Sequence, residues 1–350
     1  MYSNNHYMLP VRTHILDRPH YHWSKYVSRN PMATIFHQVN FINNLSEYFK
    51  FTCYYCHAFD AEDNLIGILP LMLCKNFMRK QALISLPHCV YGGIVADNAK
   101  SSQALIECAL SFSKTQKVDF LLLKSIQADQ SLVENLYCHF RKALSSISEE
   151  NWRAIAKEKR ADIRKAQTYG LTVTIHRNLD IFYQHYAFSL KRLGTPILHR
   201  AYFEKLLACL SENCKIFTAF YQGRPVASVM VFFFKEEVMP YYAGALEETR
   251  DLHAYDFLYW TLMEYAIQNG YKYFNFGRSR YNVGSFHYKR HWGFEAQSLN
   301  YQHWAISNHA QSEWSLHPNH PKWSLPIKMW KTLPVWLTVQ IGPWIAKQLT

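Results

Sequence analysis

The sequence predicts two α/β (α+β) domains in tandem, with mixed, mostly antiparallel sheets flanked by helices. Three observations support this fold class. The chain has 350 residues, enough for two domains at roughly 100–200 residues each. Hydrophobic residues make up 49% of the chain and charged residues only 18%, a composition that excludes a disordered protein. Segments with helical periodicity alternate with segments typical of strands.

In the first half of the chain, helix and strand patterns are separated by turn signals. The pattern predicts helices at residues 41–49 and 99–114, and strands at residues 53–59, 65–73, 83–86 and 118–123. The stretch 60–64 is rich in Asp and Asn, so it predicts a turn between two paired strands. The polar stretch 145–151 is the expected domain boundary, and Ser146 with Glu149 forms a candidate capping box there.

The second half shows a more regular order of elements. One helix is expected over 152–169 with Gly170 as its stop, followed by a strand over 171–175. Further helices are predicted at residues 180–193, 200–212 and 254–269, and strands at residues 215–221, 226–234, 238–245 and 271–276. This order matches the GNAT-type acyltransferase fold. We therefore expect GNAT-like domains at 1–147 and 148–306, then a Trp- and Lys-rich tail at 307–350.

The charge balance indicates an anionic partner. Lys and Arg number 38 against 26 Asp and Glu, which gives a net charge of +12. The excess is concentrated at 152–170 and at 277–292, and the second stretch contains no acid. Arg164 and Lys165 in the first stretch are candidate substrate-binding residues, although a charge run equally suits a solvated helix face.

Neither a membrane span nor a metal site is expected. The apolar runs are too short to cross a bilayer, and the N-terminal residues lack the features of a signal peptide, so we expect a cytoplasmic protein. Cys53 and Cys56 form a lone CxxC in a strand-like run, which favours packing over zinc binding or redox chemistry. None of the 18 His residues has zinc-ligand spacing. The sequence does not indicate an oligomeric state.

Several motifs resemble one protein family when they are taken together. They are Gly67-Ile-Leu-Pro-Leu71, Ser85-Leu-Pro87, Tyr91-Gly-Gly93, Asp162-Ile-Arg-Lys-Ala166, Lys191-Arg-Leu-Gly-Thr-Pro196, Phe274-Asn-Phe-Gly-Arg-Ser279, Gly284-Ser-Phe-His-Tyr-Lys289 and Trp292-Gly-Phe294. In combination they resemble FemAB-like proteins with a BioF2-like acetyltransferase domain, from the exosortase/PEP-CTERM-associated branch. The resemblance covers about residues 20–305.

The resemblance implies a transferase. The best-known FemAB-like proteins move an amino acid from aminoacyl-tRNA onto an amine of a peptidoglycan precursor. We therefore expect an N-acyl or aminoacyl transferase that acts on an amine of a cell-envelope or exopolysaccharide precursor. No permanently bound cofactor is implied, and the anionic acyl donor would be aminoacyl-tRNA or acyl-CoA. Tyr288 and Lys289 match the family's Phe-Lys pair, which faces the donor.

Lys289, Asp256 and Tyr242 are the candidate catalytic residues. Amine attack on an ester or thioester requires an oriented nucleophile and a stabilised oxyanion. Asp256 could orient the amine, although a first-turn acid is also favoured by the helix dipole. Tyr242 lies beside Tyr241 on the strand where GNAT folds bind the acyl group. Strand alternation lets only one of these two rings face the cleft.

Further candidates would bind the donor. Arg278, Ser279 and Arg280 follow the strand expected at 271–276, where phosphate or carboxylate groups are often bound. The ring of Tyr288 could stack on a base while Lys289 pairs with phosphate. The loop 244–253 contains three acids, Glu247, Glu248 and Asp251, which would repel pyrophosphate, and it therefore favours a donor other than CoA.

Two alternative functions stay open. One is a CoA-dependent GNAT N-acetyltransferase, and the other is a non-catalytic envelope-assembly or nucleic-acid-binding protein. The tail adds a separate expectation, because residues 310–350 hold five of the ten Trp and four Lys against the single acid Glu313. This composition is typical of a segment at a membrane surface, and it equally suits a flank of the second domain. It indicates peripheral contact with the inner membrane.

Overall fold

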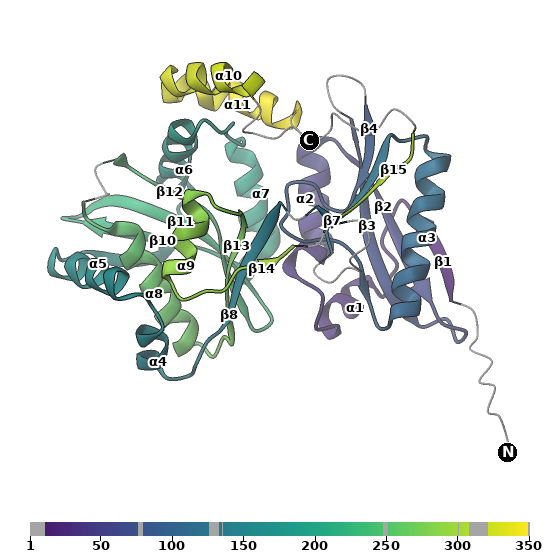
Figure 1. The fold of residues 1–350 in the computed structure, drawn as a ribbon, viewed down its shortest axis with the longest axis horizontal. Coiled ribbons are helices and arrows are strands. Elements are labelled where there is room, and N and C mark those ends of the chain that lie inside the picture. Colours follow the sequence, from purple (N-terminus) through teal and green to yellow (C-terminus); the bar gives the residue numbers. More distant parts are fainter. Residues whose placement is uncertain are drawn as a thin grey trace. The chain divides into compact units, whose positions relative to one another are not determined.

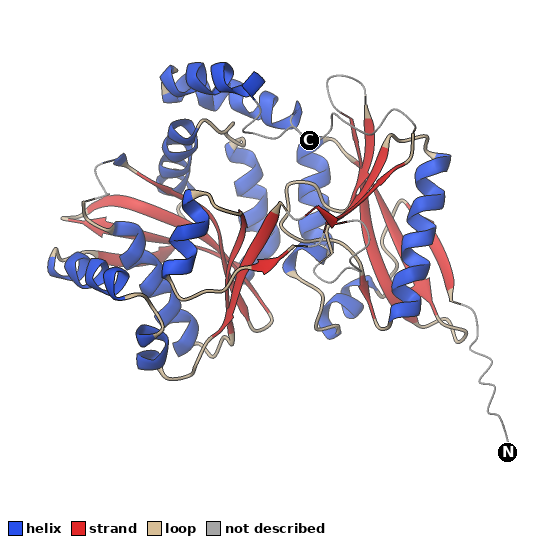
Figure 2. Cartoon of the chain, viewed as in Figure 1, coloured by secondary structure: helices blue, strands red, loops and turns tan. Residues whose placement is uncertain are grey.

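The structure is a computed structural model that describes residues 11–75, 80–125, 133–134, 136–247, 251–299, 301–307 and 321–348. The chain divides into two compact units (Figures 1 and 2). The first contains residues 1–134 and 300–314, and the second contains residues 135–299 and 315–349. Each unit has its own sheet with helices packed on it, as the sequence predicts.

The sheet of the first unit has the strand order β1-β2-β3-β4-β6-β15-β7, and β5 pairs with β3. These strands are β1 (Arg12–Leu16), β2 (Thr52–Phe59), β3 (Leu65–Lys75), β4 (Gln81–Ile84), β5 (Val95–Ala96), β6 (Phe120–Leu123), β7 (Val133–Glu134) and β15 (Tyr301–Ala305). The helices are α1 (Trp23–Arg29), α2 (Val39–Phe49) and α3 (Ala99–Thr115).

Local signals build the first unit as expected. The predicted turn at 60–64 forms, because the carboxylate of Asp60 accepts hydrogen bonds from the backbone amides of Glu62 and Asn64. Helix α3 begins at a capping box in which Asn98 and Ser101 satisfy each other's backbone amides. Leu105 of this helix is buried in one core cluster with Leu71 of β3 and other strand residues.

The sheet of the second unit has the strand order β14-β8-β13-β12-β11-β10-β9. These strands are β8 (Tyr137–Ala143), β9 (Thr172–His176), β10 (Cys214–Tyr221), β11 (Arg224–Phe234), β12 (Glu237–Ala245), β13 (Tyr273–Arg280) and β14 (Gln297–Ser298). The helices are α4 (Ser148–Arg153), α5 (Lys157–Thr168), α6 (Leu179–Leu193), α7 (Arg200–Leu210), α8 (Ala254–Gln268), α9 (Gly284–His291), α10 (Pro321–Thr332) and α11 (Val335–Gln348).

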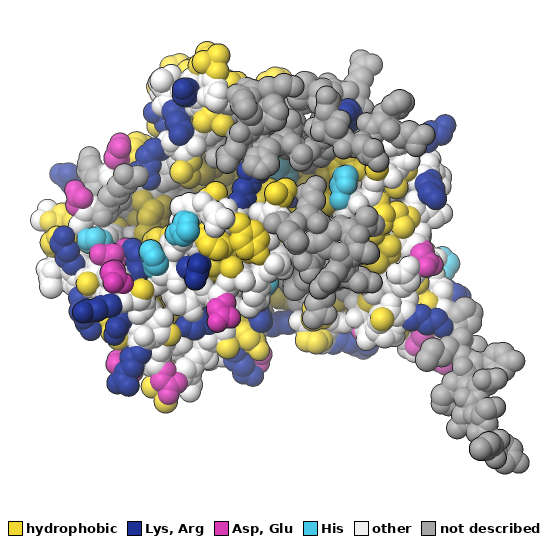
Figure 3. Space-filling view, viewed as in Figure 1, with side chains coloured by type: hydrophobic (Ala, Val, Ile, Leu, Met, Phe, Trp, Pro, Cys, Tyr) yellow, Lys and Arg dark blue, Asp and Glu magenta, His cyan; other side chains and the backbone are white. Residues whose placement is uncertain are grey.

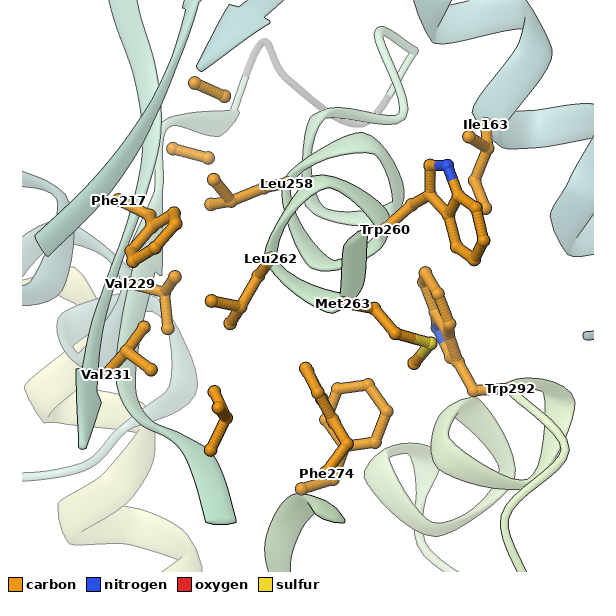
Figure 4. Close-up of a cluster of buried hydrophobic side chains, with 14 of the residues drawn as sticks. Ile163, Phe217, Val229, Val231, Leu258, Trp260, Leu262, Met263, Phe274 and Trp292 are labelled. Atoms are coloured by element: carbon orange, nitrogen blue, oxygen red, sulfur yellow. The ribbon is translucent and has the colours of Figure 1, made fainter. Parts of the chain in front are cut away.

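Helix α8 lies at the centre of the second core (Figure 4). Leu258 and Leu262 point toward the strands, where Val229 and Val231 are fully buried. Trp260 points the other way, toward α5. Helix α6 also packs on β11 and β12. A Cβ at Gly244 would lie 2.2 Å from the backbone carbon of His185, so only glycine allows β12 to approach α6 this closely.

The unit boundaries differ from the expected ranges 1–147, 148–306 and 307–350. Strand β8 pairs with β13 and therefore belongs to the second unit. Strand β15 pairs with β6 of the first unit, and the tail helices α10 and α11 belong to the second. A composition shift such as the polar stretch 145–151 shows where a chain is exposed, but it does not show which sheet a strand joins.

Two expectations about the start of the second half are wrong. The helix expected over 152–169 is divided into α4 and α5, and a Cβ at Gly293 would lie 2.1 Å from the carbonyl oxygen of Ala154 in the break. The capping box of Ser146 and Glu149 does not form, because α4 begins at Ser148 with Ile147 as its N-cap. Instead, the hydroxyl of Ser145 bonds the carboxylate of Glu150.

Within the described residues, each unit has a pair of parallel strands that separate after a short run of pairing. In the first unit, β4 pairs with β6 from Ala82 to Ile84. In the second unit, β12 pairs with β13 only at Glu237 and Val238. Beyond these residues the backbones diverge, which leaves room for side chains or a ligand between two strands of one sheet.

Candidate functional site

Two β-bulges flank the divergence of β12 and β13. In β12 the register with β11 shifts by one residue, so that Tyr241 is the extra residue. In β13 the register with β8 shifts between Asn275 and Arg278. Gly277 lies in this second bulge with a φ of 66°, and its amide donates a hydrogen bond to the side-chain oxygen of Asn275 at 2.8 Å. The left-handed backbone explains the glycine in the sequence Phe274-Asn-Phe-Gly.

The side chain of Lys289 projects from α9 onto the bulge of β13. Its Nζ donates hydrogen bonds to the carbonyl oxygens of Arg278 at 2.9 Å and Gly277 at 3.4 Å. Burial lowers the pKa of this lysine to about 7, with a further lowering by Arg278 that Cys138 opposes. Lys289 therefore changes charge near neutral pH, unlike a lysine in water.

Asp256 lies in the first turn of α8 and is the centre of a buried ionic network. Its Oδ1 accepts a hydrogen bond from the hydroxyl of Tyr288 at 2.8 Å, and its Oδ2 accepts one from Nζ of Lys159 at 3.0 Å. The side chain is only 8% exposed. Lys159 also contacts Asp162 at 3.1 Å. Burial alone would lower the pKa of Lys159, but Asp256 and Asp162 outweigh it and raise this pKa.

The same residues include a group with the composition of a cation site. Ligand atoms of Asp162, His253 and Asp256 lie within 4.8 Å of one another. The ammonium of Lys159 is bonded to both carboxylates, so a metal ion would have to displace it. The cluster is therefore an ion pair network, and we assign no metal to it.

Tyr288 and Lys289 are neighbours in sequence but have different surroundings. The ring of Tyr288 lies 5.0 Å from Nζ of Lys159 and 6.4 Å from the ring of Trp292. Burial and then Asp256 raise the pKa of its hydroxyl. The ring is thus enclosed by protein groups on the α8 side, while Lys289 lies against β13. Stacking of Tyr288 on a donor base stays a prediction.

The residues after the β13 bulge alternate between the two faces of the strand. The guanidinium of Arg278 lies 4.4 Å from the ring of Tyr137, and Arg280 donates a hydrogen bond to the hydroxyl of Tyr137 at 3.1 Å. Ser279 is buried, and its Oγ accepts a hydrogen bond from the hydroxyl of Ser285 on α9 at 3.2 Å. The two arginines therefore share a face of β8 and β13, and Ser279 faces α9.

The bulge in β12 changes the expected arrangement of the tyrosine pair. The ring of Tyr241 stacks on Phe232 at 5.0 Å, and the ring of Tyr242 contacts the same Phe232 at 6.2 Å. The hydroxyl of Tyr242 lies 3.2 Å from that of Tyr202 on α7. Both rings lie near Phe232 because the extra residue interrupts the alternation of the strand, and which of the two faces a cleft stays a prediction.

Arg164 and Lys165 have their ring contacts close to their own helix, α5. Arg164 lies over the ring of Trp152 at 5.4 Å, and Lys165 lies over the ring of Tyr169 at 5.8 Å. These contacts do not join them to the group around Lys289. Their proposed role in substrate binding stays a prediction.

The first unit contains a cavity of about 540 Å³ between the segment directly after β6 and the N-terminal part of α3. It is lined by Tyr91, Gly92, Gly93, Asp97, Asn98, Lys124, Ser125, Gln302 and neighbouring residues. Lys124 follows β6 directly and is only 7% exposed. Its Nζ donates to the carbonyl oxygens of Leu86 and Cys89 at 3.4 Å each, so the cavity has a buried cation in its wall.

The two glycines of the motif Tyr91-Gly-Gly93 let the chain lie against the segment after β6. The amide of Gly93 donates to the carbonyl oxygen of Lys124 at 3.1 Å. A Cβ at Gly93 would lie 2.5 Å from the backbone nitrogen of Ser125, and Gly92 has a φ of 134°. Sequence reasoning identified this motif only as a mark of family resemblance and missed Lys124. The signal that points to Lys124 in the sequence is its position directly after the apolar, strand-like run 118–123.

Comparisons with known proteins support the GNAT-like fold. A family model described as an acetyltransferase (GNAT) domain matches residues 153–290. The crystal structure of FemX is similar over 83% of this chain and 97% of that chain, with a TM-score of 0.66 and 12% identity. No curated protein sequence matches the chain.

The structures of a putative lysylphosphatidylglycerol synthetase domain and of L-PGS are also similar. The C-terminal domain of the putative enzyme from Agrobacterium fabrum covers 80% of this chain and 89% of its own, with a TM-score of 0.54 and 13% identity. L-PGS from Bacillus licheniformis covers 86% of this chain and 96% of its own, with a TM-score of 0.51 and 12% identity. At these identities the similarity establishes the fold, which is a tandem of GNAT-like domains as predicted.

Proposed function

We propose that this protein is an N-acyl or aminoacyl transferase that acts on an amine of a cell-envelope or exopolysaccharide precursor. One observation carries the choice of donor. In a GNAT fold that uses CoA, pyrophosphate binds at the N-terminus of the helix after the fourth strand. Here that helix is α8, and its N-terminus is occupied by Asp256, which is paired with Lys159 and lies close to Asp162. Two carboxylates at this position disfavour pyrophosphate, and so favour aminoacyl-tRNA as the donor.

The chemistry needs a cation close to the reacting groups. In the proposed reaction the amine attacks the ester carbon of the donor and a tetrahedral oxyanion forms. The bond from this carbon to the tRNA ribose oxygen then breaks, and the proton lost by the amine ends on that oxygen, which leaves as an alcohol. Lys289 would stabilise negative charge on the donor or leaving group. A pKa of about 7 also allows it to exchange a proton near neutral pH.

The cavity of the first unit is the proposed binding site for the acceptor. Lys124 and the first residues of α3 line it together, and a lysine beside a helix N-terminus suits a phosphate or carboxylate group. The lysylphosphatidylglycerol synthetases among the similar structures are named for a product that joins lysine to an anionic lipid. The motif resemblance to the exosortase-associated branch supports a precursor of extracellular polysaccharide.

We place the proposed enzyme in the cytoplasm, with peripheral contact at the inner membrane. Among the described residues, no helix is long and apolar enough to cross a bilayer. The second candidate function is a CoA-dependent N-acetyltransferase, which the description of the matching family model favours. A non-catalytic binding protein is the third.

A donor assay separates these functions. Purified protein is incubated with aminoacyl-tRNA or acetyl-CoA, each labelled in the acyl group, together with an extract of envelope precursors. We expect faster loss of label from the tRNA in the presence of extract, no such loss from acetyl-CoA, and no micromolar affinity for acetyl-CoA in calorimetry. Micromolar binding and turnover of acetyl-CoA would establish the second function. Binding of precursor without turnover of either donor would favour the third.

Lys124→Met is expected to raise KM for the acceptor about tenfold and to leave kcat within about twofold. The substitution keeps the apolar stem of a residue that lines the cavity but removes its charge. If the lysine stabilises the bound acceptor equally in the ground state and the transition state, its loss raises KM and leaves kcat unchanged. Steady-state kinetics with varied acceptor check this. Lys117→Met, on the loop between α3 and β6, is the control. An unchanged KM would exclude the cavity as the acceptor site.

A further inference from the structure

Helices α10 and α11 pack on α6 through one side of each helix. Trp330 of α10 is buried, and a Cβ at Gly194 at the end of α6 would lie 2.6 Å from Ile327. In α11, Thr338, Gly342, Pro343 and Ala346 form the buried side, and Gly342 lies against the backbone of Ile197. The tail therefore packs on the second unit, which is one of the two arrangements that its composition suits.

The opposite sides of both helices expose large apolar side chains. In α11, Trp336 is 64% exposed, Trp344 is 68% exposed and Ile341 is 36% exposed. These three residues fall within one arc of the helix, away from the buried arc of Thr338 and Ala346. In α10, Leu325 and Met329 are 65% and 61% exposed, one turn apart. Figure 3 shows apolar side chains beside Lys and Arg over these helices.

Packing alone does not explain this surface. Side chains that cover a flank of a domain lose their exposure, yet these five apolar residues keep more than a third of theirs. Isolated exposed apolar residues are normal, whereas a contiguous apolar face usually binds another surface. We call the exposed residues Leu325, Met329, Trp336, Ile341 and Trp344 the tail face.

Charge indicates what binds the tail face. The sequence from residue 314 to residue 350 contains no Asp or Glu. Lys328 and Lys331 of α10 are exposed, and Lys328 lies between the two apolar residues of the tail face on that helix. Trp rings prefer the headgroup region of a bilayer, and Lys is attracted to anionic lipid. Because no acid from residue 314 onward offsets the lysines, the charge of this surface favours an anionic bilayer over a neutral partner.

We propose that the tail face binds the surface of a bilayer that contains anionic lipid, with α10 and α11 lying in the plane of the interface. The two helices have 12 and 14 residues, and each has a proline inside it, so they suit the interface rather than a span. This inference concerns the attachment of the protein to membranes, and it holds whichever acyl donor the protein uses.

Vesicle co-sedimentation of the full-length protein tests the proposal. The vesicles contain phosphatidylcholine alone or phosphatidylcholine with one third phosphatidylglycerol. We expect binding to the anionic vesicles, at least tenfold weaker binding by Trp336→Ser/Trp344→Ser, and several-fold weaker binding by Lys328→Gln/Lys331→Gln. High salt is expected to weaken binding of the wild type and to have less effect on the lysine variant.

Tyr21→Ser is the matched control, because Tyr21 is an aromatic residue of the first unit that is 81% exposed. A second variant on the other helix, Leu325→Ser/Met329→Ser, tests the same face without the tryptophans. Equal binding by the wild type and both apolar variants, or binding by none of them, would overturn the proposal. A dimer in solution that dissociates in the Trp variant, without vesicle binding, would identify the face as a contact between copies of this chain.

Discussion

Lys289→Met is expected to reduce transfer between tenfold and a thousandfold, which corresponds to roughly 1.4–4 kcal/mol of transition-state stabilisation. The methionine keeps the apolar part of the side chain over Phe140 but removes the cation at the bulge of β13. The measurement is kcat/KM with limiting donor. Lys272→Met is the control, because Lys272 immediately precedes the same strand and is 65% exposed.

The pH dependence separates a role in transfer from a role in folding. If the ammonium of Lys289 supports transfer, kcat/KM falls as the pH rises through about 7, and this fall is absent in the variant. The folded state lowers the pKa of Lys289 below its unfolded value. Burial of the charge therefore costs stability below pH 7, and this cost disappears as the pH rises toward the unfolded pKa. If the variant transferred the acyl group as fast as the wild type, Lys289 would have no role in the reaction.

Asp256→Ala is expected to lower the free energy of unfolding by about 3 kcal/mol, because the buried ammonium of Lys159 loses one of its two carboxylate partners and a buried hydrogen bond is broken. Lys159 would keep Asp162 as a partner, and the hydroxyl of Tyr288 would lose its acceptor. Urea unfolding, followed by tryptophan fluorescence, measures the effect. A double-mutant cycle with Tyr288→Phe gives the part of the loss that belongs to the hydrogen bond between these two residues.

The matched control for Asp256 is Glu149→Ala. Glu149 pairs with Arg153 on α4, and the two side chains are 58% and 74% exposed. Its removal is expected to cost less than about 1 kcal/mol, as usual for a surface pair. If Asp256→Ala were as stable as this control and still lost transfer, Asp256 would be a catalytic acid or base rather than a structural one.

The sequence motifs identified the important segment of the second unit but not the direction of its side chains. The pair of Tyr288 and Lys289 was found from its resemblance to a family motif. Helix α9 itself was not predicted, because its eight residues are mostly polar and have little periodicity. One turn of this short helix directs Tyr288 to Asp256 and Lys289 to β13, and only packing decides such directions.

The sequence pattern predicts too early an end for β13 and does not indicate the cavity of the first unit. Arg278, Ser279 and Arg280 were expected after the end of a strand at residue 276, whereas β13 continues to Arg280 through a bulge. The cavity in the first unit was not expected at all. Its cation, Lys124, contacts carbonyl groups that precede it by 35 and 38 residues, so no local pattern contains the information.

The sequence by itself determined most of the longer helices and strands and their order, which gave the tandem fold class. Periodicity, the turn at 60–64 and the helix stop at Gly170 act over a few residues, and the turn and the stop form in the structure as predicted. Tertiary structure decided the exchange of β8 and β15 between the two units, the two bulges and the pairing of Lys159 with Asp256. Lys159 and Asp256 are 97 residues apart. Contacts of this kind depend on which surfaces meet when the sheets assemble, and the free energy of burying a charge is set by that environment rather than by neighbours along the chain.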